Sequence, residues 1–370
     1  MPEPIIRAGQ VIALRLFDIA YAIDLKRAET LWAARTPRAG ERRRLSFTPP
    51  KAMAFGVPPL ALTLGEVPLT LGGATVAASV TARLYDFGVA ALALSVPVVD
   101  RGWGDFVGLV NQVDQAVGFR VAGPWAGLLA ELRGPIAEAL DRPSGAVLEE
   151  DYLLGVVNRL DEPLSAEALQ QRVDLVPLLT GEQRPLSDGA RADVLRHRFS
   201  YYPDDLVALT WDRAFVYEPR QDTDVIDVLE VANAQLLEMR FYDELLDDEL
   251  PRIYDLVEEA RRGAKLLAAR RYGRLARRLY GLVAEVTELT ERVDNALQVT
   301  EDVYLARVYA AAMALFRVPA VGAAVDRKLA LIRDTYGALY AEASGSRAEW
   351  LEVAILLLIA VEIVLSLVRH

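Results

Sequence analysis

The clearest structural signal in the chain is the run LALTLGEVPLTLGGATVAASVTARLYDFGVAALALSVPV at residues 60–98. It lies within a longer segment, residues 51–99, where valine, leucine, threonine and alanine are interrupted every few residues by glycine or proline. Apolar, β-branched runs bounded by turn residues are typical of short strands in hairpins. The segment therefore predicts three or four antiparallel strands joined by turns.

Further strands and helices are predicted on both sides of this segment. Strand patterns occur at residues 11–25, 151–158 and 206–217, and helical spacing occurs at residues 103–117, 125–140 and 165–180. Neighbouring strands with interspersed helices are typical of α+β proteins. We therefore predict that residues 1–219 form an α+β domain with a mainly antiparallel sheet and helices on one side.

Helical spacing then continues, without strand patterns, over residues 220–346. A short heptad repeat, with steps of four and three, is formed by Leu282, Val286, Leu289, Val293 and Ala296. This repeat covers about two heptads, which is short for a stable coiled coil. We therefore predict a long-helix bundle in this region and favour packing within one chain over an extended coiled coil.

The 370-residue chain has a formal net charge of −11, but that charge is unevenly distributed. Residues 141–260 carry a net charge of −17, whereas residues 261–280 contain eight basic residues and no acidic one. The acidic balance argues against sequence-specific DNA binding. The basic block leaves room for a confined anionic partner, such as RNA phosphate or lipid headgroups.

Two interpretations of the basic block remain open. The acidic run 243–259 and the basic run 261–278 flank Gly263. If the chain turns at Gly263, the two runs lie antiparallel and form ion pairs that fix register more than they add stability. If the helix continues, one of its faces offers a basic surface to an anionic partner. That surface consists of Arg270, Arg274, Arg277 and Arg278.

Residues 350–368 are almost uniformly apolar, because thirteen of the nineteen are leucine, isoleucine or valine. A helix of this length is about 28 Å long, close to the thickness of the bilayer hydrocarbon. Inserting these side chains is favourable by about 5 kcal/mol, whereas Glu362 costs about 3 kcal/mol and Glu352, nearer the interface, costs less. Trp350 stands where an interfacial aromatic residue is expected. We therefore predict a single C-terminal transmembrane anchor at residues 347–370.

A carboxylate inside a bilayer needs a proton or a partner. Ser366 lies one helical turn beyond Glu362, and the same helix of a second subunit is another candidate partner. The alternative for this segment is a helix buried on all sides in the bundle. Because the N-terminal residues lack a signal-peptide pattern, the bulk of the chain is expected in the cytoplasm.

The sequence lacks the residues that several kinds of catalytic and metal-binding sites require. Cysteine is absent and histidine occurs only at His197 and His370, which excludes a disulfide framework, a thiolate zinc site and a cysteine nucleophile. No phosphate-binding loop or nucleophile elbow is found. Asp222 and Asp224 are interpreted as N-capping residues of a helix rather than metal ligands. We therefore predict no cofactor, no metal site and no catalytic residue.

Residues Val225 to Arg240, followed by Tyr242 and Asp243, resemble the central helix of the "required for meiotic nuclear division" family (domain of unknown function 155). The polar positions of this family-like helix are Asp227, Glu230, Asn233, Gln235, Glu238 and Arg240. The apolar C-terminal segment is similar to the closing segment of that family. One branch of the family supports translation at a mitochondrial membrane, so the resemblance implies a membrane-tethered protein with a ribosome or another anionic partner.

The leading hypothesis is a non-enzymatic scaffold or adaptor that is held at a membrane by its last helix and assembles as a homo-oligomer. Membrane lipid is then one partner, and an anionic surface meeting the basic block is another. A second hypothesis is a transport or channel component in which a ring of Glu362 side chains lines a cation path. A third is an α+β and helical enzyme whose activity depends on acidic residues or on His197.

Overall fold

The computed structural model describes residues 3–35, 53–55, 57–119, 121–145, 148–262, 273–284, 286–288, 297–299 and 303–338. The chain divides into two compact units, of which the first spans Met1–Glu238 and Arg292–Pro319 and the second spans Met239–Glu291 and Ala320–His370. The predicted boundary at residue 219 therefore lies inside the first unit. The predicted boundary at residue 346 lies outside the described residues.

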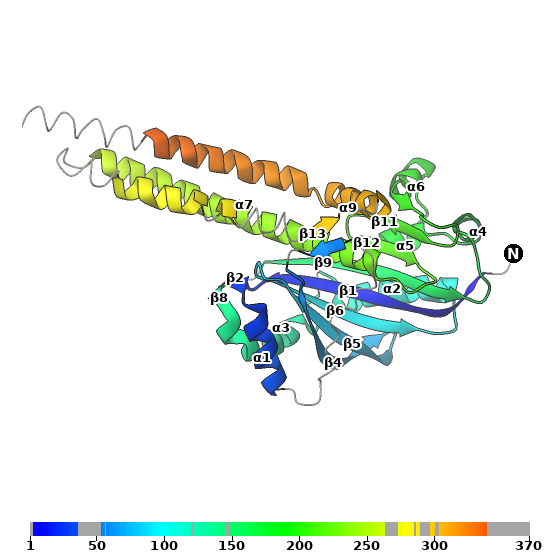
Figure 1. The fold of residues 1–370 in the computed structure, drawn as a ribbon. Helices are drawn as coiled ribbons and strands as arrows, with labels where there is room; N and C mark the ends of the chain where they lie inside the picture. Colours follow the sequence, from blue (N-terminus) through cyan, green and yellow to red (C-terminus); the bar gives the residue numbers. More distant parts are fainter. Residues whose placement is uncertain are drawn as a thin grey trace, which may run out of the picture. The chain divides into compact units, whose positions relative to one another are not determined.

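The first unit combines a large sheet with helices (Figure 1). Its strands are β1 (Ile5–Asp18), β2 (Ala20–Ile23), β3 (Met53–Phe55), β4 (Leu60–Leu71), β5 (Ala74–Leu84), β6 (Val89–Val98), β7 (Arg101–Gly102), β8 (Leu140–Pro143), β9 (Glu149–Leu160), β10 (Arg198–Phe199), β11 (Leu206–Leu209), β12 (Arg213–Tyr217) and β13 (Leu297–Val299). Its helices are α1 (Leu25–Arg35), α2 (Trp103–Val117), α3 (Trp125–Ile136), α4 (Ala166–Arg172), α5 (Val176–Thr180), α6 (Asp188–Val194), α9 (Val303–Leu315) and the first part of α7 (Asp224–Arg262). The prediction of an α+β protein with an N-terminal, mainly antiparallel sheet and C-terminal helices is confirmed.

The main sheet has the strand order β10-β11-β12-β9-β1-β6-β5-β4, and β7 also pairs with β1. All its neighbouring strands are antiparallel except β12 and β9, which are parallel. The inner strand β1 lies between β9 and β6 (Figure 1). Its residues 11–18 are all buried, which fits an inner strand that is covered on both faces.

The connection from β5 to β6 depends on Gly88. This residue has a φ angle of +103°, and a Cβ atom there would lie 1.8 Å from the Ala20 carbonyl oxygen. The Gly88 carbonyl also accepts a hydrogen bond from the Ile19 N–H at 3.1 Å. Only glycine combines this backbone conformation with so close an approach.

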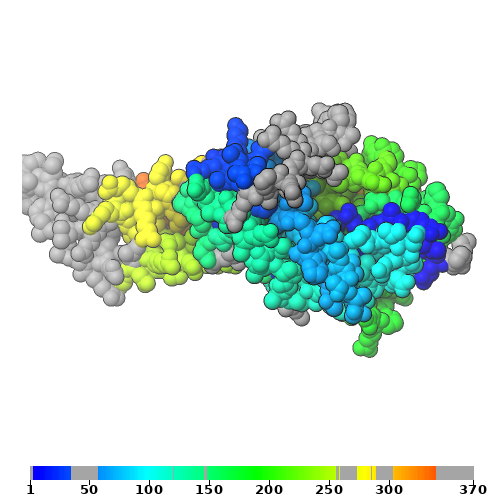
Figure 2. Space-filling view, turned by 90° about the horizontal axis from the view of Figure 1, so that it is seen from below, coloured from blue at the N-terminus to red at the C-terminus, as the bar shows by residue number. Residues whose placement is uncertain are grey.

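Helices cover both faces of the sheet. On one face, residues of α2, α3 and α5 such as Phe106, Leu132 and Leu178 pack into a core with the strands. On the other face, the start of α7 buries Leu229 and contacts Arg83 of β5. Side chains of β4 and β5 (light blue) reach the surface beside those of α2 (cyan) in Figure 2. The prediction of helices on one side concerned residues 1–219 only, and it did not include α7, which begins at Asp224 and covers the other face.

One predicted helix, at residues 165–180, is two helices. Ser165 caps α4, since its Oγ accepts a hydrogen bond from the Ala168 N–H at 3.1 Å. The helix then stops before Pro177, which has no N–H to continue the ladder. Asp174 instead accepts the Val176 N–H at 3.0 Å, and α5 begins at Val176. The short helix α6 was not predicted.

The second unit contains the remainder of α7, a helix at residues 273–284 and most of the helix Val318–Ala338. Arg278 Nη2 lies 3.0 Å from Glu249 Oε2. A continuous helix would place these residues about 43 Å apart, so the chain reverses direction between them. The antiparallel interpretation of the acidic and basic runs therefore holds at Arg278. Lys328 also pairs with the acidic run, at 2.6 Å from Asp243 and from Asp247.

Within the described residues, no single helix has the length and apolar character needed to cross a membrane. The bent pair formed by Val303–Leu315 and Val318–Ala338 reaches that requirement only when both helices are taken together. The predicted anchor, with Trp350, Glu352, Glu362 and Ser366, lies outside the described residues.

Asp18 is a buried carboxylate at the end of β1, where only 2% of the residue is exposed. Burial raises the pKa of Asp18 to about 6, although a hydrogen bond from Ser144 Oγ to Asp18 Oδ2 at 2.9 Å lowers it. The ordinary pKa of an aspartate is about 3.9. Folding therefore favours the protonated form of this side chain.

Replacing Asp18 with asparagine is expected to raise the free energy of unfolding by about 2 kcal/mol at pH 7.5 and to change it little at pH 4. Because the pKa is raised in the folded state, the stability contributed by Asp18 is fully present below about pH 4 and is lost as the pH rises through about 6. Urea denaturation at both pH values measures the effect. An equal effect at the two pH values would contradict it.

Candidate functional site

The polar residues predicted on the family-like helix begin with a buried ion-pair cluster at the start of α7. Arg83 Nη1 of β5 lies 2.5 Å from Asp227 Oδ1 and 3.2 Å from Glu230 Oε2. Tyr85 Oη donates a hydrogen bond to Glu230 Oε1 at 2.7 Å. Asp227, Glu230 and Tyr85 are buried. One arginine therefore faces two carboxylates where α7 covers the sheet.

Burial dominates the electrostatics of this cluster. It raises the pKa of Glu230, against the lowering effect of Arg83 and of the Tyr85 hydrogen bond. It also raises the pKa of the Tyr85 hydroxyl well above its ordinary value. Burial alone would lower the pKa of Arg83, but Glu230 and Asp227 raise it above its ordinary value. The arginine thus stays charged and compensates the buried acids.

The other polar residues of the family-like helix are also directed into packing. Asn233 Nδ2 donates to the Leu229 carbonyl at 2.9 Å, and Tyr309 Oη of α9 donates to Gln235 Oε1. Glu238 is buried, and Arg240 is half-buried in the second unit. Asp227, Glu230 and Gln235 thus attach α7 to its surroundings in the first unit, whereas the Asn233 hydrogen bond lies within α7. This geometry favours a structural role for them over ligand binding.

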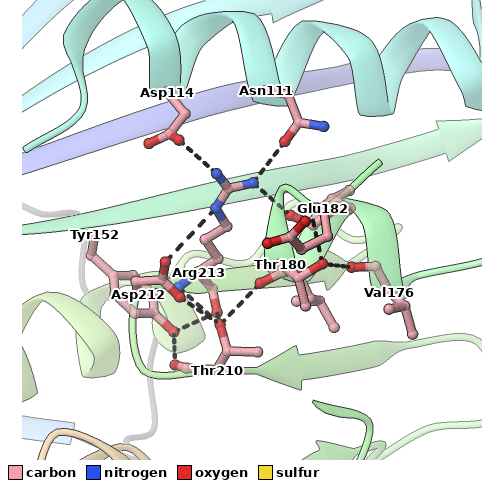
Figure 3. A network of polar contacts seen from close by, with 11 residues as sticks. Asn111, Asp114, Tyr152, Val176, Thr180, Glu182, Thr210, Asp212 and Arg213 are labelled. Carbon is pink, nitrogen blue, oxygen red and sulfur yellow. Dashed lines mark hydrogen bonds and ion pairs between the residues drawn. The ribbon is translucent and has the colours of Figure 1, made fainter. Parts of the chain in front are cut away.

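A second network centres on Arg213, the first residue of β12 (Figure 3). Its guanidinium donates to Asp114 Oδ2 at 2.6 Å and to Asn111 Oδ1 at 2.7 Å, both on α2, and to the Leu178 carbonyl of α5 at 3.1 Å. The Arg213 carbonyl accepts a hydrogen bond from Tyr152 Oη at 2.9 Å. One side chain therefore connects α2, α5 and β12.

The Arg213 network is closely packed. Gly181, at the end of α5, has a φ angle of +70°, and a Cβ atom there would lie 2.6 Å from Arg213 Nη2. Burial raises the pKa of the neighbouring Asp212, although Arg213 and Thr210 lower it. The Arg213 guanidinium already donates hydrogen bonds to groups of α2 and α5. We therefore assign this network a structural role.

A third polar group surrounds an open pocket of about 180 Å³ in the first unit. It is lined by Tyr201, Tyr202, Asp205, Val207, Val216, Tyr217, Glu218, Arg220, Asp222, Asp224, Val225, Tyr304 and Leu305. These residues come from the loop before β11, from β11 and β12, from the connection between β12 and α7, from the start of α7 and from α9. This third group therefore adjoins a cavity among the described residues.

Three tyrosine rings form one wall of this pocket. The Tyr201 ring meets Tyr202 edge-on at a centroid distance of 4.7 Å, and it lies 5.4 Å from the Tyr304 ring at an angle of 47°. Asp205 holds the loop in place, because its carboxylate accepts the backbone N–H groups of Tyr201 and Tyr202 at 2.7 and 3.0 Å. The aromatic wall is therefore fixed by a buried carboxylate.

Arg220 occupies one side of the same pocket. Its guanidinium stacks on Tyr202, with Cζ 3.7 Å from the ring centroid. The Nε and Nη2 groups donate to Glu218 Oε1 and Oε2 at 3.1 and 3.4 Å, and Nη2 also donates to Asp205 Oδ2 at 3.3 Å. The hydrogen bond to Glu218 raises the pKa of Arg220.

The pocket is acidic overall. Its lining contains four carboxylates and one guanidinium, a net charge of −3. Asp222 Oδ1 accepts the N–H of Asp224, the first residue of α7, at 3.0 Å from just outside the helix. The structure therefore places neither aspartate at the N-cap position, which falls at Thr223. Aromatic faces together with excess carboxylate are suited to an organic cation.

The remaining predicted residues do not meet at a site in the described structure. Arg274, Arg277 and Arg278 have exposed side chains in the second unit, and Arg270 lies outside the described residues. His197 lies between α6 and β10, where its carbonyl accepts the Leu209 N–H at 2.9 Å. In the described residues, no group of three or more acidic, histidine or cysteine side chains could hold a metal ion.

Sequence reasoning missed the tyrosine pocket. The local signal was the run Tyr-Tyr-Pro-Asp-Asp at residues 201–205, which places two aromatic residues beside two acids. Tyr304 gave no such signal, since it lies about a hundred residues further along the chain. Only the fold brings the two segments together.

Comparison with known proteins identifies the family of the first unit. Residues 8–223 match the family described as "Uncharacterized protein MJ0711, N-terminal domain", which is more than half of the chain. The chain belongs to this family. A protein of Methanocaldococcus jannaschii, itself named "Uncharacterized protein MJ0711", is 24% identical over 221 residues. That alignment covers 60% of this chain and 66% of the relative, just under two thirds of its length.

The MJ0711 family match ends one residue before α7 begins. It includes the pocket residues from Tyr201 to Asp222 but not Tyr304. It also stops before the segment from Val225 to Arg240, so the resemblance to the "required for meiotic nuclear division" family stays a prediction. No solved structure matches the chain.

Proposed function

We propose that this protein is a non-enzymatic scaffold or adaptor that holds a partner in the tyrosine pocket while its C-terminal segment tethers it to a membrane. The pocket carries the proposal. It combines an open cavity, three tyrosine rings and an acidic lining in one part of the first unit. Exposed aromatic side chains next to a cavity are typical anchors for a binding partner.

The scaffold interpretation is supported by the way the other polar groups are used. The Arg83 cluster and the Arg213 network connect secondary-structure elements within the first unit. A pocket whose tyrosine loop is already held by Asp205 suits binding, because little ordering of the site is needed when a partner arrives.

The proposed membrane tether and the proposed anionic partner are inferred mainly from the amino-acid sequence. Residues 350–368 have the composition of a membrane-spanning helix. Arg274 and Arg277 have exposed side chains that are suited to an anionic surface such as a ribosome or lipid headgroups. Self-association through the same C-terminal segment is part of the proposal.

A photo-crosslinking amino acid at Tyr201 tests the binding function. Full-length protein in its native membranes should give a discrete crosslinked species from this position. The matched control places the same amino acid at Tyr280, which is 65% exposed in the second unit, and should not give that species. Identical products at both positions, or none at either, would contradict a binding role for the pocket.

Deleting residues 347–370 tests the tether separately. The shortened chain is expected to leave the membrane fraction, because the deleted segment supplies the insertion energy of a few kcal/mol. It is expected to keep its helical content, because residues 347–370 lie outside the described helices and strands. Membrane flotation and circular dichroism provide the measurements. Aggregation of the shortened chain would instead indicate that this helix belongs to a core.

A further inference from the structure

We propose that a second copy of this chain packs, in antiparallel orientation, against the exposed side of the helix Val318–Ala338, drawn in orange after α9 in Figure 1. From Ala320 onwards this helix belongs to the second unit. The proposal goes beyond the proposed function, which places self-association in the C-terminal segment 347–370. We call the exposed side of the helix the outer face. Its midline consists of Ala323, Ala330 and Gly337.

The opposite side of this helix packs within the second unit. Val325, Leu329 and Ile332 are buried. Lys328 Nζ lies 2.6 Å from Asp243 Oδ1 on α7. This side therefore already has its partner in the same chain.

The outer face is exposed along its whole midline. Ala323, Ala330 and Gly337 recur at every seventh position, which places them on one line along the helix. Leu331 beside them is 50% exposed. A Cβ atom at Gly337 would meet nothing within 4 Å, so packing within the described chain does not require glycine there. Side chains this small let a second helix approach closely, and its approach would cover Leu331.

The outer face also differs in charge from the other helices of the second unit. Exposed residues of α7 such as Asp248 and Asp255 are acidic, whereas Arg274 and Arg277 are exposed on the helix at residues 273–284. The outer face instead carries two aspartates and two arginines among its small residues, so its net charge is zero. Its two signs of charge are thus balanced on one surface.

The charges of the outer face match those of a second copy. Asp326 and Arg333 lie on one flank of Ala330. Arg327 and Asp334 lie on the other flank. In an antiparallel pair centred on Ala330, a two-fold axis brings each flank against the same flank of the other copy. Asp326 is then level with Arg333 of the other copy to within about 1.5 Å along the helix axis, and Arg327 is equally close in level to Asp334. Every one of these charges therefore meets an opposite charge.

These four charges are available for a partner. Within the part of the chain that the structure describes, none of them forms a hydrogen bond or an ion pair. Because one surface supplies both signs, it is complementary to itself, as the interface of a two-fold dimer must be. A lipid or nucleic-acid surface would instead call for an excess of positive charge. The occupant that fits the outer face is thus a second copy of the chain.

Cysteine crosslinking of the purified full-length chain in detergent tests the orientation. The chain has no cysteine of its own, so each substitution reports on one position. Ala330→Cys should form a disulfide-linked dimer on mild oxidation, because the two copies of this residue meet at the centre of the pair. Ala323→Cys should not link to itself, since its two copies lie about 21 Å apart along the axis. Co-expressed Ala323→Cys and Gly337→Cys chains should link to each other.

Two results of the crosslinking would overturn the proposal. Ala330→Cys that gives no disulfide-linked dimer would mean that the outer faces do not meet. Ala323→Cys that links to itself as readily as Ala330→Cys would mean that the helices are parallel or collide at random.

Charge reversal tests the pairing. Asp326→Arg should weaken the dimer about five- to thirtyfold in analytical ultracentrifugation, because two ion pairs are replaced by repulsion. Adding Arg333→Asp should restore the dimer, since the pair is then present with its signs exchanged. The exposed control Asp255→Arg changes the net charge equally and should leave the dimer unchanged. Equal weakening by the control, or no restoration in the double variant, would overturn the proposal.

The same measurements separate this proposal from the proposed function. A stable full-length dimer without the Ala330→Cys link would leave self-association with the C-terminal segment, so the outer-face proposal alone would be wrong. A full-length chain that stays monomeric would remove both forms of self-association and leave the outer face to a different occupant. Linking through Ala330→Cys in a chain that does not float with membranes would support the outer face while contradicting the tether.

Discussion

Replacing Arg83 with methionine is expected to lower the free energy of unfolding by about 3–5 kcal/mol at pH 7. Arg83 is the cation that faces Asp227 and Glu230 at the start of α7. Methionine keeps much of the side-chain volume but leaves two buried carboxylates without a charge partner. Breaking a buried ion pair on one side is costly for this reason.

The loss should depend on pH in a defined direction. The pKa of Glu230 is already raised by burial, and removing Arg83 raises it further. The folded Arg83→Met variant therefore binds a proton at Glu230 more tightly than the unfolded chain does. The destabilisation should be smallest below about pH 4 and should grow as the pH rises through the raised pKa.

Chemical denaturation at pH 4 and pH 7 measures this prediction. Adding Glu230→Gln to the Arg83→Met variant should recover part of the stability at pH 7, because glutamine keeps the shape and can still accept the Tyr85 hydrogen bond. The exposed control Arg274→Met should change stability by less than about 0.5 kcal/mol. A loss that does not depend on pH would argue against the charge mechanism.

Replacing Arg213 with methionine is expected to cost about 3 kcal/mol, because its hydrogen bonds to Asn111, Asp114 and the Leu178 carbonyl are lost together. Asp114 is 40% exposed, so solvent reduces the penalty for leaving it unpaired. Thermal or urea unfolding gives the size of the loss.

A matched variant shows whether the Arg213 effect comes from burial. Arg196 forms an ion pair with Asp193 whose side chains are 68% and 67% exposed, and Arg196→Met should therefore change stability by less than about 0.5 kcal/mol. Similar effects of the two substitutions would mean that the Arg213 contacts are no more valuable than a surface pair.

The parts of the fold that are determined by neighbouring residues could be predicted from the sequence. Glycine and proline between β-branched runs predicted the antiparallel strands from β4 to β6, and helical spacing predicted α2. The parallel pairing of β12 with β9 has no local signature, because it joins Arg213–Tyr217 to a strand more than fifty residues earlier. Likewise, nothing local in α7 indicates that its first part belongs to the same unit as the sheet.

The candidate site was harder to predict than the fold. Asp227 and Glu230 stood out as polar residues on an apolar helix, yet their role depends on Arg83, which comes from a distant strand. The pocket joins Tyr201 with Tyr304 through tertiary structure alone. Patterns of spacing report which face of an element is buried, but they do not report what lies opposite that face.

The position of α9 has a consequence for protein synthesis. Residues 303–316 belong to the first unit, where Phe316 packs edge-on against Tyr152 of β9 at 5.2 Å and Tyr309 bonds to Gln235 of α7. Because translation proceeds from the N-terminus, the ribosome must first make the segment Met239–Glu291 of the other unit. Nascent chains that end within that segment therefore lack these contacts to Tyr152 and Gln235, and this interval is when they most need protection from aggregation.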